Sequence, residues 1–290
     1  MKRVIYSLYI DLPAKEHFGN SKNKHDTIEK ADVTINAFKK HYNKLVESKL
    51  TYAEYCEAEF IMFEYDSKYI TFENNFLKDF PEFTGYEVIN FYKIHLLQEL
   101  AKKYDEILYL DFDVIPLTNE SFFDTWDLSK GICVYNNNMH VNSRNQPLHK
   151  LNHTDRSPTA KYYNAQAMLI ATGHNPECDV INTGIIGAKR EHIKQLKYFD
   201  DFRTTLDLMT KLRKEDDGMY LPNIRKMFAY DNETLFSYKL KATNTPHQWL
   251  DKSWHFFFDK IWYIPKTVKI VHCINKEFDV AWDRYEKNNL

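Results

Sequence analysis

The chain has 290 residues, of which 43% are hydrophobic and 28% charged, so it can bury a sizeable core and has a globular rather than a disordered composition. Its formal net charge of −2 argues against a general nucleic-acid-binding protein, whose affinity depends on a basic surface. No stretch approaches the roughly 20 apolar residues of a membrane-spanning helix, and we expect no membrane span.

Cysteine usage and the N-terminal residues predict the compartment. The four cysteines are widely spaced and include no CxxC pair, which argues against a zinc site or a disulfide framework and favours reduced thiols. The first residues, MKRVIYSLYIDLP, resemble a signal peptide only superficially, because the apolar run ends at Asp11 and no small-residue cleavage site follows. We therefore expect a cytoplasmic protein, bacterial or, if viral, in the host cytoplasm.

The first half of the chain alternates between strand and helix patterns. Residues 4–10 and 59–65 are apolar and rich in β-branched and aromatic side chains, as in buried strands. Residues 26–49 and 85–104 carry apolar side chains at three- and four-residue spacing, as in amphipathic helices. The strand EILYL follows the second helix directly. This order predicts an α/β fold with a mostly parallel sheet flanked by helices.

The second half contains shorter elements around one long polar segment. Residues 136–176 are rich in Asn, His, Pro and Thr, with YNAQAMLIAT as the only apolar island, and form a long connection or a small subdomain. The other patterns predict strands at 131–135, at DVINTGIIG and at 268–274, and helices at 190–214 and 231–241. Without an internal repeat or a low-complexity linker, we expect a single domain spanning 1–290.

Asp111 and Asp113 stand at the end of an apolar strand, in YDEILYLDFDVIPL. Alternation along an extended chain places both carboxylates on one side and Phe112 on the other. Ligands gather at the carboxyl ends of the strands in such sheets. Two hard oxygen ligands there suit Mg²⁺ or Mn²⁺ together with substrate phosphates. The alternative, an aspartate pair that caps a turn, fits less well because VIPL follows and no solvated turn is evident.

The same segment resembles the DxD segment of nucleotide-sugar-dependent glycosyltransferases of the GT-A fold. It is most similar to the retaining glycogenin-like and bacterial galactosyltransferase-like group. INTGIIGAKREH resembles the N-x-G strand of that group, YDNETLF its acidic segment before a short helix, and IVHCINKEFDVAW its closing H-x-x-G-x-x-K-P-W segment. These segments follow in the expected order over roughly residues 86–282, as the resemblance requires.

The closing segment implies contacts to a metal and to the diphosphate. The resemblance implies that His272 is a third metal ligand beside the aspartate pair and that Lys276 meets the diphosphate. The segment departs from the pattern: its Gly is replaced around Asn275, Lys276 comes four rather than six residues after His272, and no Pro precedes Trp282. His272 therefore matches the pattern better than Lys276. A buried histidine and a solvent-facing lysine are the alternatives.

Two further segments hold candidates for the sugar-transfer chemistry. Asn182 and Gly184 could form a close-packed floor beneath the sugar, since Gly permits close backbone approach, or a simple turn. Asp231 and Glu233 could hold donor hydroxyls, act as the acceptor base or only start a helix. Asp231 is the preferred acid of the two.

Position suggests which residues bind the nucleotide. Tyr9 and Asp11, at the end of the first strand, are expected to stack on the base and to hydrogen-bond it. Lys93, on the helix before the DxD strand, could reach the nucleotide or its phosphates, or lie along its helix. The aromatic segment 247–263 is either core or a sugar-stacking platform, with core preferred. Four histidines in and near the polar segment match no zinc spacing: His140, His149, His153 and His174.

These expectations describe a metal-dependent hexosyl- or pentosyltransferase. The donor would be a nucleotide-diphosphate sugar, expected to be UDP-linked, and the acceptor a hydroxyl of a glycan or glycoconjugate, with retention as the resemblance implies. Residues 1–135 would form the nucleotide-sugar half and 136–290 the acceptor half. A sugar nucleotidyltransferase is one alternative, but its Gly-rich basic loop is missing after the first strand. A non-catalytic carbohydrate-binding protein is the other, and the intact acid pair and His272 argue against it.

Overall fold

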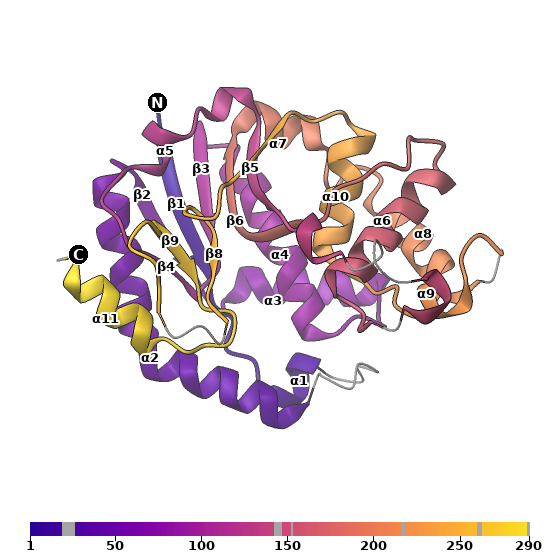
Figure 1. Cartoon of the computed structure of the whole chain (residues 1–290), viewed down its shortest axis with the longest axis horizontal. Helices are drawn as coiled ribbons and strands as arrows, with labels where there is room; N and C mark the ends of the chain where they lie inside the picture. Colours follow the sequence, from indigo (N-terminus) through magenta and orange to yellow (C-terminus); the bar gives the residue numbers. More distant parts are fainter. Residues whose placement is uncertain (19–26, 142–146, 152, 216–217, 260–262, 289–290) are drawn as a thin grey trace.

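The centre of the molecule is a six-stranded mixed sheet (Figure 1). The computed structural model describes residues 1–290 apart from 19–26, 142–146, 152, 216–217, 260–262 and 289–290. In the order β2-β1-β3-β6-β5-β7, the strands are Glu59–Phe63, Arg3–Leu8, Glu106–Leu110, Ile181–Lys189, Ile132–Asn136 and His247–Trp249. β6 is antiparallel to β3 and β5, and the other adjacent pairs are parallel. The prediction of an α/β fold with a mostly parallel sheet in a single domain is confirmed.

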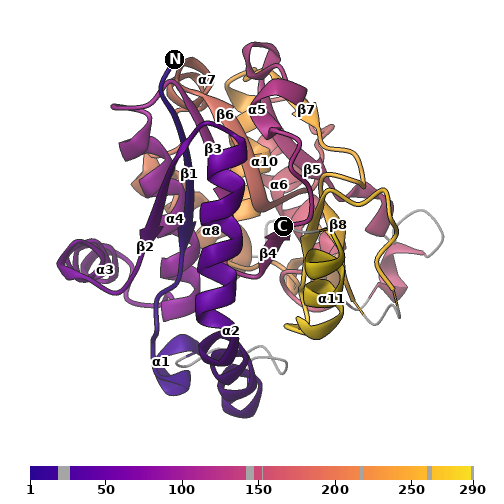
Figure 2. The same cartoon turned by 90° about the vertical axis from the view of Figure 1, so that its left-hand side faces the viewer.

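Helices cover both faces of this sheet, and the alternation along β1 shows how. Val4 and Tyr6 pack into the larger core with α4, whereas Ile5 packs into a second core with Tyr52 of α2. Figure 2 shows α2 in front of the first strands and α4 behind them. The helices are α1 (Ala14–Phe18), α2 (Ile28–Tyr55), α3 (Ser67–Asp79), α4 (Gly85–Leu100), α5 (Phe122–Thr125), α6 (Pro158–Ala171), α7 (Arg190–Leu196), α8 (Phe202–Lys214), α9 (Pro222–Arg225), α10 (Asn232–Ala242) and α11 (Asp279–Lys287).

A small second sheet brings the C-terminal segment to the end of β3. Its order is β4-β9-β8, with strands at Val114–Pro116, Ile270–His272 and Phe256–Phe257. β4 begins directly after Asp113, and its antiparallel register places Val114 opposite His272. Residues far apart in the sequence therefore meet beside the DxD segment.

Side-chain caps explain where several helices begin. Thr84 and Glu87 form a reciprocal capping box at the start of α4, and Asp231 accepts hydrogen bonds from the first turn of α10. Asp66 caps α3, a helix that the sequence analysis did not predict, by accepting hydrogen bonds from Lys68 and Tyr69. Within the described part of the chain, no helix has the length and apolar character needed to cross a membrane.

The prediction of one helix over 190–214 is wrong. α7 ends at Leu196 and is followed by Lys197, with φ of 48°, and α8 begins after Asp201, with φ of 52°. Both residues are in the left-handed region, which most side chains avoid, so the helix-favouring sequence between them does not continue as a helix. The polar segment 136–176 contains α6, whose N-terminus is capped by Ser157 and begins with a proline.

Candidate active site

A cavity of about 400 Å³ opens at the C-terminal ends of β1 and β3. It is lined by residues from both halves of the chain, 1–135 and 136–290. Every candidate site residue except Asp11 and Gly184 lines it: Tyr9, Lys93, Asp111, Asp113, Asn182, Asp231, Glu233, His272 and Lys276. The structure thus brings nine of the sequence-derived candidates to one cavity.

Asp111, Asp113 and His272 converge in the cavity. The expectation of an extended chain at the aspartate pair is wrong, because the Val114 N–H donates a 3.0 Å hydrogen bond to the Asp111 carbonyl and the chain turns between β3 and β4. His272 Nε2 lies 3.3 Å from Asp113 Oδ1 and 3.8 Å from Asp111 Oδ2. One ligand atom from each residue lies within 4.8 Å of the others. Among the described residues, these three are the only group of at least three His, Cys, Asp or Glu side chains that lie close enough together to hold a metal ion. Two carboxylates and a ring nitrogen suit Mn²⁺ or Mg²⁺, so the residues fit a divalent cation.

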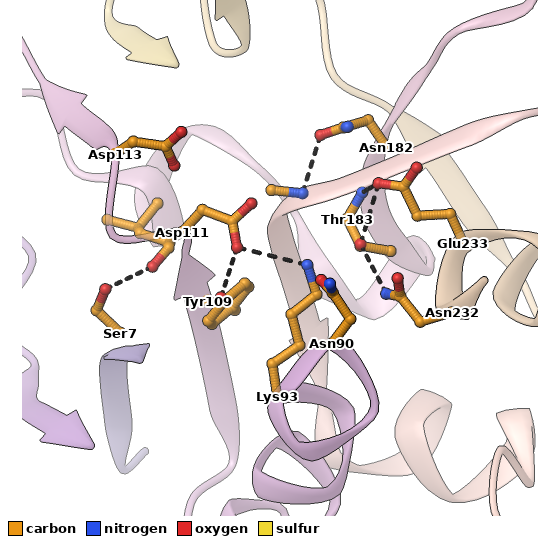
Figure 3. Close-up of polar contacts among 12 residues, drawn as sticks. Ser7, Asn90, Lys93, Tyr109, Asp111, Asp113, Asn182, Thr183, Asn232 and Glu233 are labelled. Carbon is orange, nitrogen blue, oxygen red and sulfur yellow. Dashed lines mark hydrogen bonds and ion pairs between the residues drawn. The ribbon is translucent and has the colours of Figure 1, made fainter. Parts of the chain in front are cut away.

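Basic side chains and a tyrosine hold the two aspartates, and Figure 3 shows the contacts of Asp111 with Tyr109 and Lys93. Tyr109 donates a hydrogen bond of 2.5 Å to Asp111 Oδ1, and the Lys93 ammonium lies 3.4 Å from the same oxygen. Lys276 donates a 2.6 Å hydrogen bond to Asp113 Oδ2. Burial by itself would raise the pKa of Asp113, but the Lys276 ammonium and His272 outweigh burial and hold that pKa well below its ordinary value. Asp113 is therefore a carboxylate.

Lys276 reaches the cavity despite its unusual spacing from His272. Its φ is 61°, and its backbone N–H donates to the carbonyl of Cys273, so the chain turns sharply after β9. This turn brings the ammonium back to Asp113. The Asp113 carboxylate raises the pKa of Lys276, although burial opposes this effect. Despite the departure from the family spacing, a charged lysine therefore stands beside Asp113.

Asp231 and Glu233 form a second acidic group at the start of α10. Asp231 Oδ1 caps the helix by accepting hydrogen bonds from the N–H groups of Glu233 and Thr234. Asp231 therefore both starts the helix, as the alternative interpretation expected, and lines the cavity. Glu233 Oε1 accepts from the N–H and hydroxyl of Thr183 at 2.7 and 3.1 Å, and Glu233 Oε2 pairs with Lys161. Both carboxylate oxygens of Glu233 are therefore engaged.

Lys161 is a site residue that the sequence analysis missed. It lies in α6, within the 136–176 segment, and its ammonium also stands 3.7 Å from Asp231 Oδ2. Burial would raise the pKa of Glu233, but Lys161 outweighs this effect and keeps that pKa below its usual value. Ser157 and the following proline signal the start of α6 in the sequence, yet nothing local indicates that Lys161 meets acids some 70 residues later.

Gly184 lies against the metal-ligand candidates rather than beneath an open space. A Cβ added at Gly184 would stand 2.4 Å from His272 Cε1 and 2.9 Å from Asn182 Oδ1. Asn182 Oδ1 accepts a 2.9 Å hydrogen bond from the Gly184 N–H, and the Asp111 N–H donates to the Gly184 carbonyl (Figure 3). The close-packed floor expected at this strand therefore supports the His272 ring.

Tyr9 and Asp11 lie toward the outer side of the cavity. The Tyr9 ring stacks on Phe112 at 4.8 Å and 16°. Asp11 pairs with Lys39 at 3.0 Å and accepts from the Tyr9 hydroxyl at 3.2 Å, in an adjoining depression that Tyr9 and Tyr42 also line. Asp11 is thus near the proposed base contact but outside the cavity that holds the aspartate pair.

His255 is a further residue that the sequence analysis missed. Its Nε2 lies 3.1 Å from His272 Nδ1, on the ring edge that points away from the aspartates. Burial lowers the pKa of His255 well below its ordinary value, so the ring is neutral. In the aromatic segment that contains it, Trp254 is buried in the core, as preferred, Trp249 is partly buried, and Trp262 lies outside the described residues.

A second cavity of about 550 Å³ adjoins the first and shares Asn182 and Ile274 with it. Its wall combines aromatic rings with polar groups: Tyr135, Phe256, Phe257, Asn137, His140, Lys252 and Asp259. His255 also lines it. The two cavities meet where Asn182 stands.

The mostly parallel sheet carries a carboxylate pair, a histidine and basic side chains in a cavity at its carboxyl edge, which agrees with the nucleotide-sugar-dependent glycosyltransferases that the sequence resembles. The model of glycosyl transferase family 8 matches residues 4–207. The chain therefore belongs to glycosyl transferase family 8, and the predicted resemblance is confirmed. It is a glycosyltransferase.

Solved structures with similar folds are distant in sequence. A glycosyltransferase involved in the glycosylation of the major capsid of PBCV-1 has 16% identity and a TM-score of 0.43, with 100% of both chains covered. An active-site mutant of LgtC has 11% identity and a TM-score of 0.47, covering 93% of this chain and 86% of that one. Mouse xyloside xylosyltransferase 1 has 11% identity and a TM-score of 0.46, covering 94% and 97%. No curated protein sequence matches the chain.

Proposed function

We propose that this family 8 enzyme transfers a sugar from a nucleotide-diphosphate donor, UDP-linked, to a hydroxyl of a glycan or glycoconjugate. The observation that carries the proposal is the convergence of Asp111, Asp113 and His272 in the cavity. These three residues would hold Mn²⁺ or Mg²⁺. When bound, the ion neutralises the diphosphate and stabilises it as a leaving group.

The chain's own cations complete the donor site. Lys276 and Lys93, which pair with Asp113 and Asp111, would contact the phosphates as point charges. Tyr9 offers an aromatic edge for the base, with Asp11 beside it as a hydrogen-bond acceptor. The donor would therefore lie from Tyr9, across the aspartates, toward Asn182.

The second cavity is our proposed acceptor site. Aromatic rings such as Tyr135 and Phe257 suit the apolar faces of sugars, and Asn137 and Lys252 can hydrogen-bond hydroxyls. Because Asn182 borders both cavities, an acceptor hydroxyl would reach the donor sugar beside it. Residues 136–290 would thus supply most of the acceptor side, although Tyr135 belongs to the first half.

Asp231 and Glu233 are proposed to act on the donor sugar. Both Glu233 oxygens are bound by Thr183 and Lys161, so Glu233 is suited to orient groups rather than to attack. Asp231 Oδ2 is less committed, with Lys161 at 3.7 Å. We propose transfer with retention, in which the leaving phosphate accepts the acceptor proton. An inverting reaction would instead require a carboxylate base, and Asp231 would be that residue.

The compartment we propose is the cytoplasm. All four cysteines are free and buried, as in proteins of reducing compartments. Membership of a glycosyltransferase family argues against the nucleotidyltransferase and non-catalytic alternatives.

Calorimetric titration tests the donor site. Wild type, Asp113→Ala and the control Asp207→Ala, an exposed residue of α8, would be titrated with UDP, GDP, ADP and CDP, each with and without Mn²⁺. We expect one nucleotide, UDP, to bind in a Mn²⁺-dependent manner to wild type and to the control but not to Asp113→Ala. Folded wild type that binds none of the nucleotides would refute the proposal.

A further inference from the structure

The metal-ligand candidate His272 has a second ring nitrogen, Nδ1, on the edge away from the aspartates. Among the hydrogen bonds of the described residues, the one side-chain partner of this nitrogen is His255. His255 directly precedes β8 and is 1% exposed. Its Nε2 is 3.1 Å from His272 Nδ1, while its own Nδ1 is buried and has no hydrogen-bond partner within the described part of the chain. The contact is therefore a single hydrogen bond between two buried imidazoles.

The direction of this hydrogen bond decides what His272 can bind. A neutral imidazole carries one N–H and one lone pair. If His255 donates, the proton of His272 sits on Nε2 and points at Asp113 Oδ1, 3.3 Å away, which leaves no lone pair for a cation. If His255 accepts, the proton of His272 sits on Nδ1 and Nε2 is free to ligate. His272 can therefore bind a cation only in the tautomer in which it donates its Nδ1–H to His255.

We propose that His255 is a positioning residue that accepts the Nδ1–H of His272 and so presents the Nε2 lone pair to a divalent cation. The inference rests on the proposed metal site. Metal-ligating histidines commonly donate their second N–H to a fixed acceptor, which sets both tautomer and ring orientation. Here the acceptor is a neutral imidazole, which can take the Nδ1–H of His272 when a cation occupies Nε2 and adds no further negative charge beside the two aspartates.

Packing holds both rings in place. The His255 ring contacts Tyr135 and Phe257 at centroid distances of 5.2 and 4.7 Å. On the other side, the missing side chain of Gly184 leaves room for the His272 ring. Tyr135, Phe257 and His255 also line the second cavity, so one ring connects its wall to the metal-ligand candidate. A residue at 255 must therefore fill space and also accept a hydrogen bond.

Mn²⁺ binding to a variant series separates these two roles. His255→Phe keeps a ring but cannot accept, and we expect it to weaken Mn²⁺ binding by about 10–100-fold in calorimetry or in the electron paramagnetic resonance signal of free Mn²⁺. His255→Gln, whose amide oxygen can accept, should restore most of the affinity. His192→Phe is the matched control, since His192 is also a buried histidine that pairs through Nε2, in this case with the Ser129 carbonyl.

The tautomer itself can be read in the unmodified protein. In ¹⁵N spectra of histidine-labelled wild type saturated with diamagnetic Mg²⁺, we expect the proton of His272 on Nδ1. Wild-type Mn²⁺ affinity in His255→Phe would overturn the inference and leave the proposed function intact. A proton on Nε2 with Mg²⁺ bound would overturn the inference and also remove His272 from the proposed metal ligands. Folded wild type that binds neither ion, with or without nucleotide, would instead remove the metal site and the inference with it.

Discussion

Gly184→Ala should disable the metal site at a modest cost in stability. The added Cβ would lie 2.4 Å from His272 Cε1 and 2.7 Å from His272 Nδ1. An ordinary carbon–carbon contact needs about 3.5 Å, so the ring or β6 must move by about 1 Å. Metal–ligand distances tolerate only about 0.2 Å. We therefore expect Mn²⁺ affinity to fall by at least about tenfold, together with the overpacking cost of about 1–3 kcal/mol.

The same strand offers a matched control. A Cβ at Gly187 would lie 2.3 Å from Phe122 Cε1, in the second core and about 10 Å along β6 from Gly184. Gly187→Ala should therefore cost a similar amount, about 1–3 kcal/mol or roughly 2–6 °C in melting temperature, without affecting Mn²⁺ binding. Thermal unfolding and Mn²⁺ calorimetry on both variants provide the comparison. Wild-type Mn²⁺ affinity in Gly184→Ala would refute the reasoning.

Three further predictions concern the charged and aromatic residues of the cavity. Lys161→Met leaves two buried acids without their partner and should lower the free energy of unfolding by about 3 kcal/mol in urea titration, whereas Lys211→Met, at an exposed pair, should cost under about 1 kcal/mol. Because the folded-state pKa of Glu233 is lowered, its stabilisation is present above the unfolded pKa of about 4.3 and lost as the pH falls through the folded value. In Glu233→Gln, the free energy of unfolding should therefore fall less steeply as the pH is lowered below about 4.3 than in wild type. An unchanged pH dependence would contradict the lowered pKa of Glu233. Tyr9→Ala should weaken UDP binding about tenfold in calorimetry, while Tyr9→Phe, which keeps the ring, should bind nearly as wild type; equal losses would exclude stacking.

Local patterning was sufficient for the elements whose character is set by neighbouring residues. The helix expected over 85–104, which the structure has at Gly85–Leu100, was predicted from its apolar stripe, a local pattern, and the Thr84–Glu87 capping box that begins it is local as well. The break between α7 and α8 was not, because Lys197 and Asp201 adopt left-handed backbone angles without a glycine to signal them. Conformations that tertiary packing imposes on ordinary residues leave no mark in composition or periodicity.

The residues of the candidate site also fall into two groups: those signalled by the local sequence and those that only the folded chain brings to the site. The position of Asp111 and Asp113 directly after an apolar strand is a local signal, but the turn that these residues form between β3 and β4 was not predicted. His272 was expected only from resemblance, and the register of β4 with β9 brings it to them. Lys161 and His255 were not expected at all: each acts through a partner 17 or more residues away, Glu233 and His272, respectively. Sequence alone determined the fold class and the aspartate pair, whereas ion pairing and tautomer choice depend on distances of a few ångströms that only the folded chain sets.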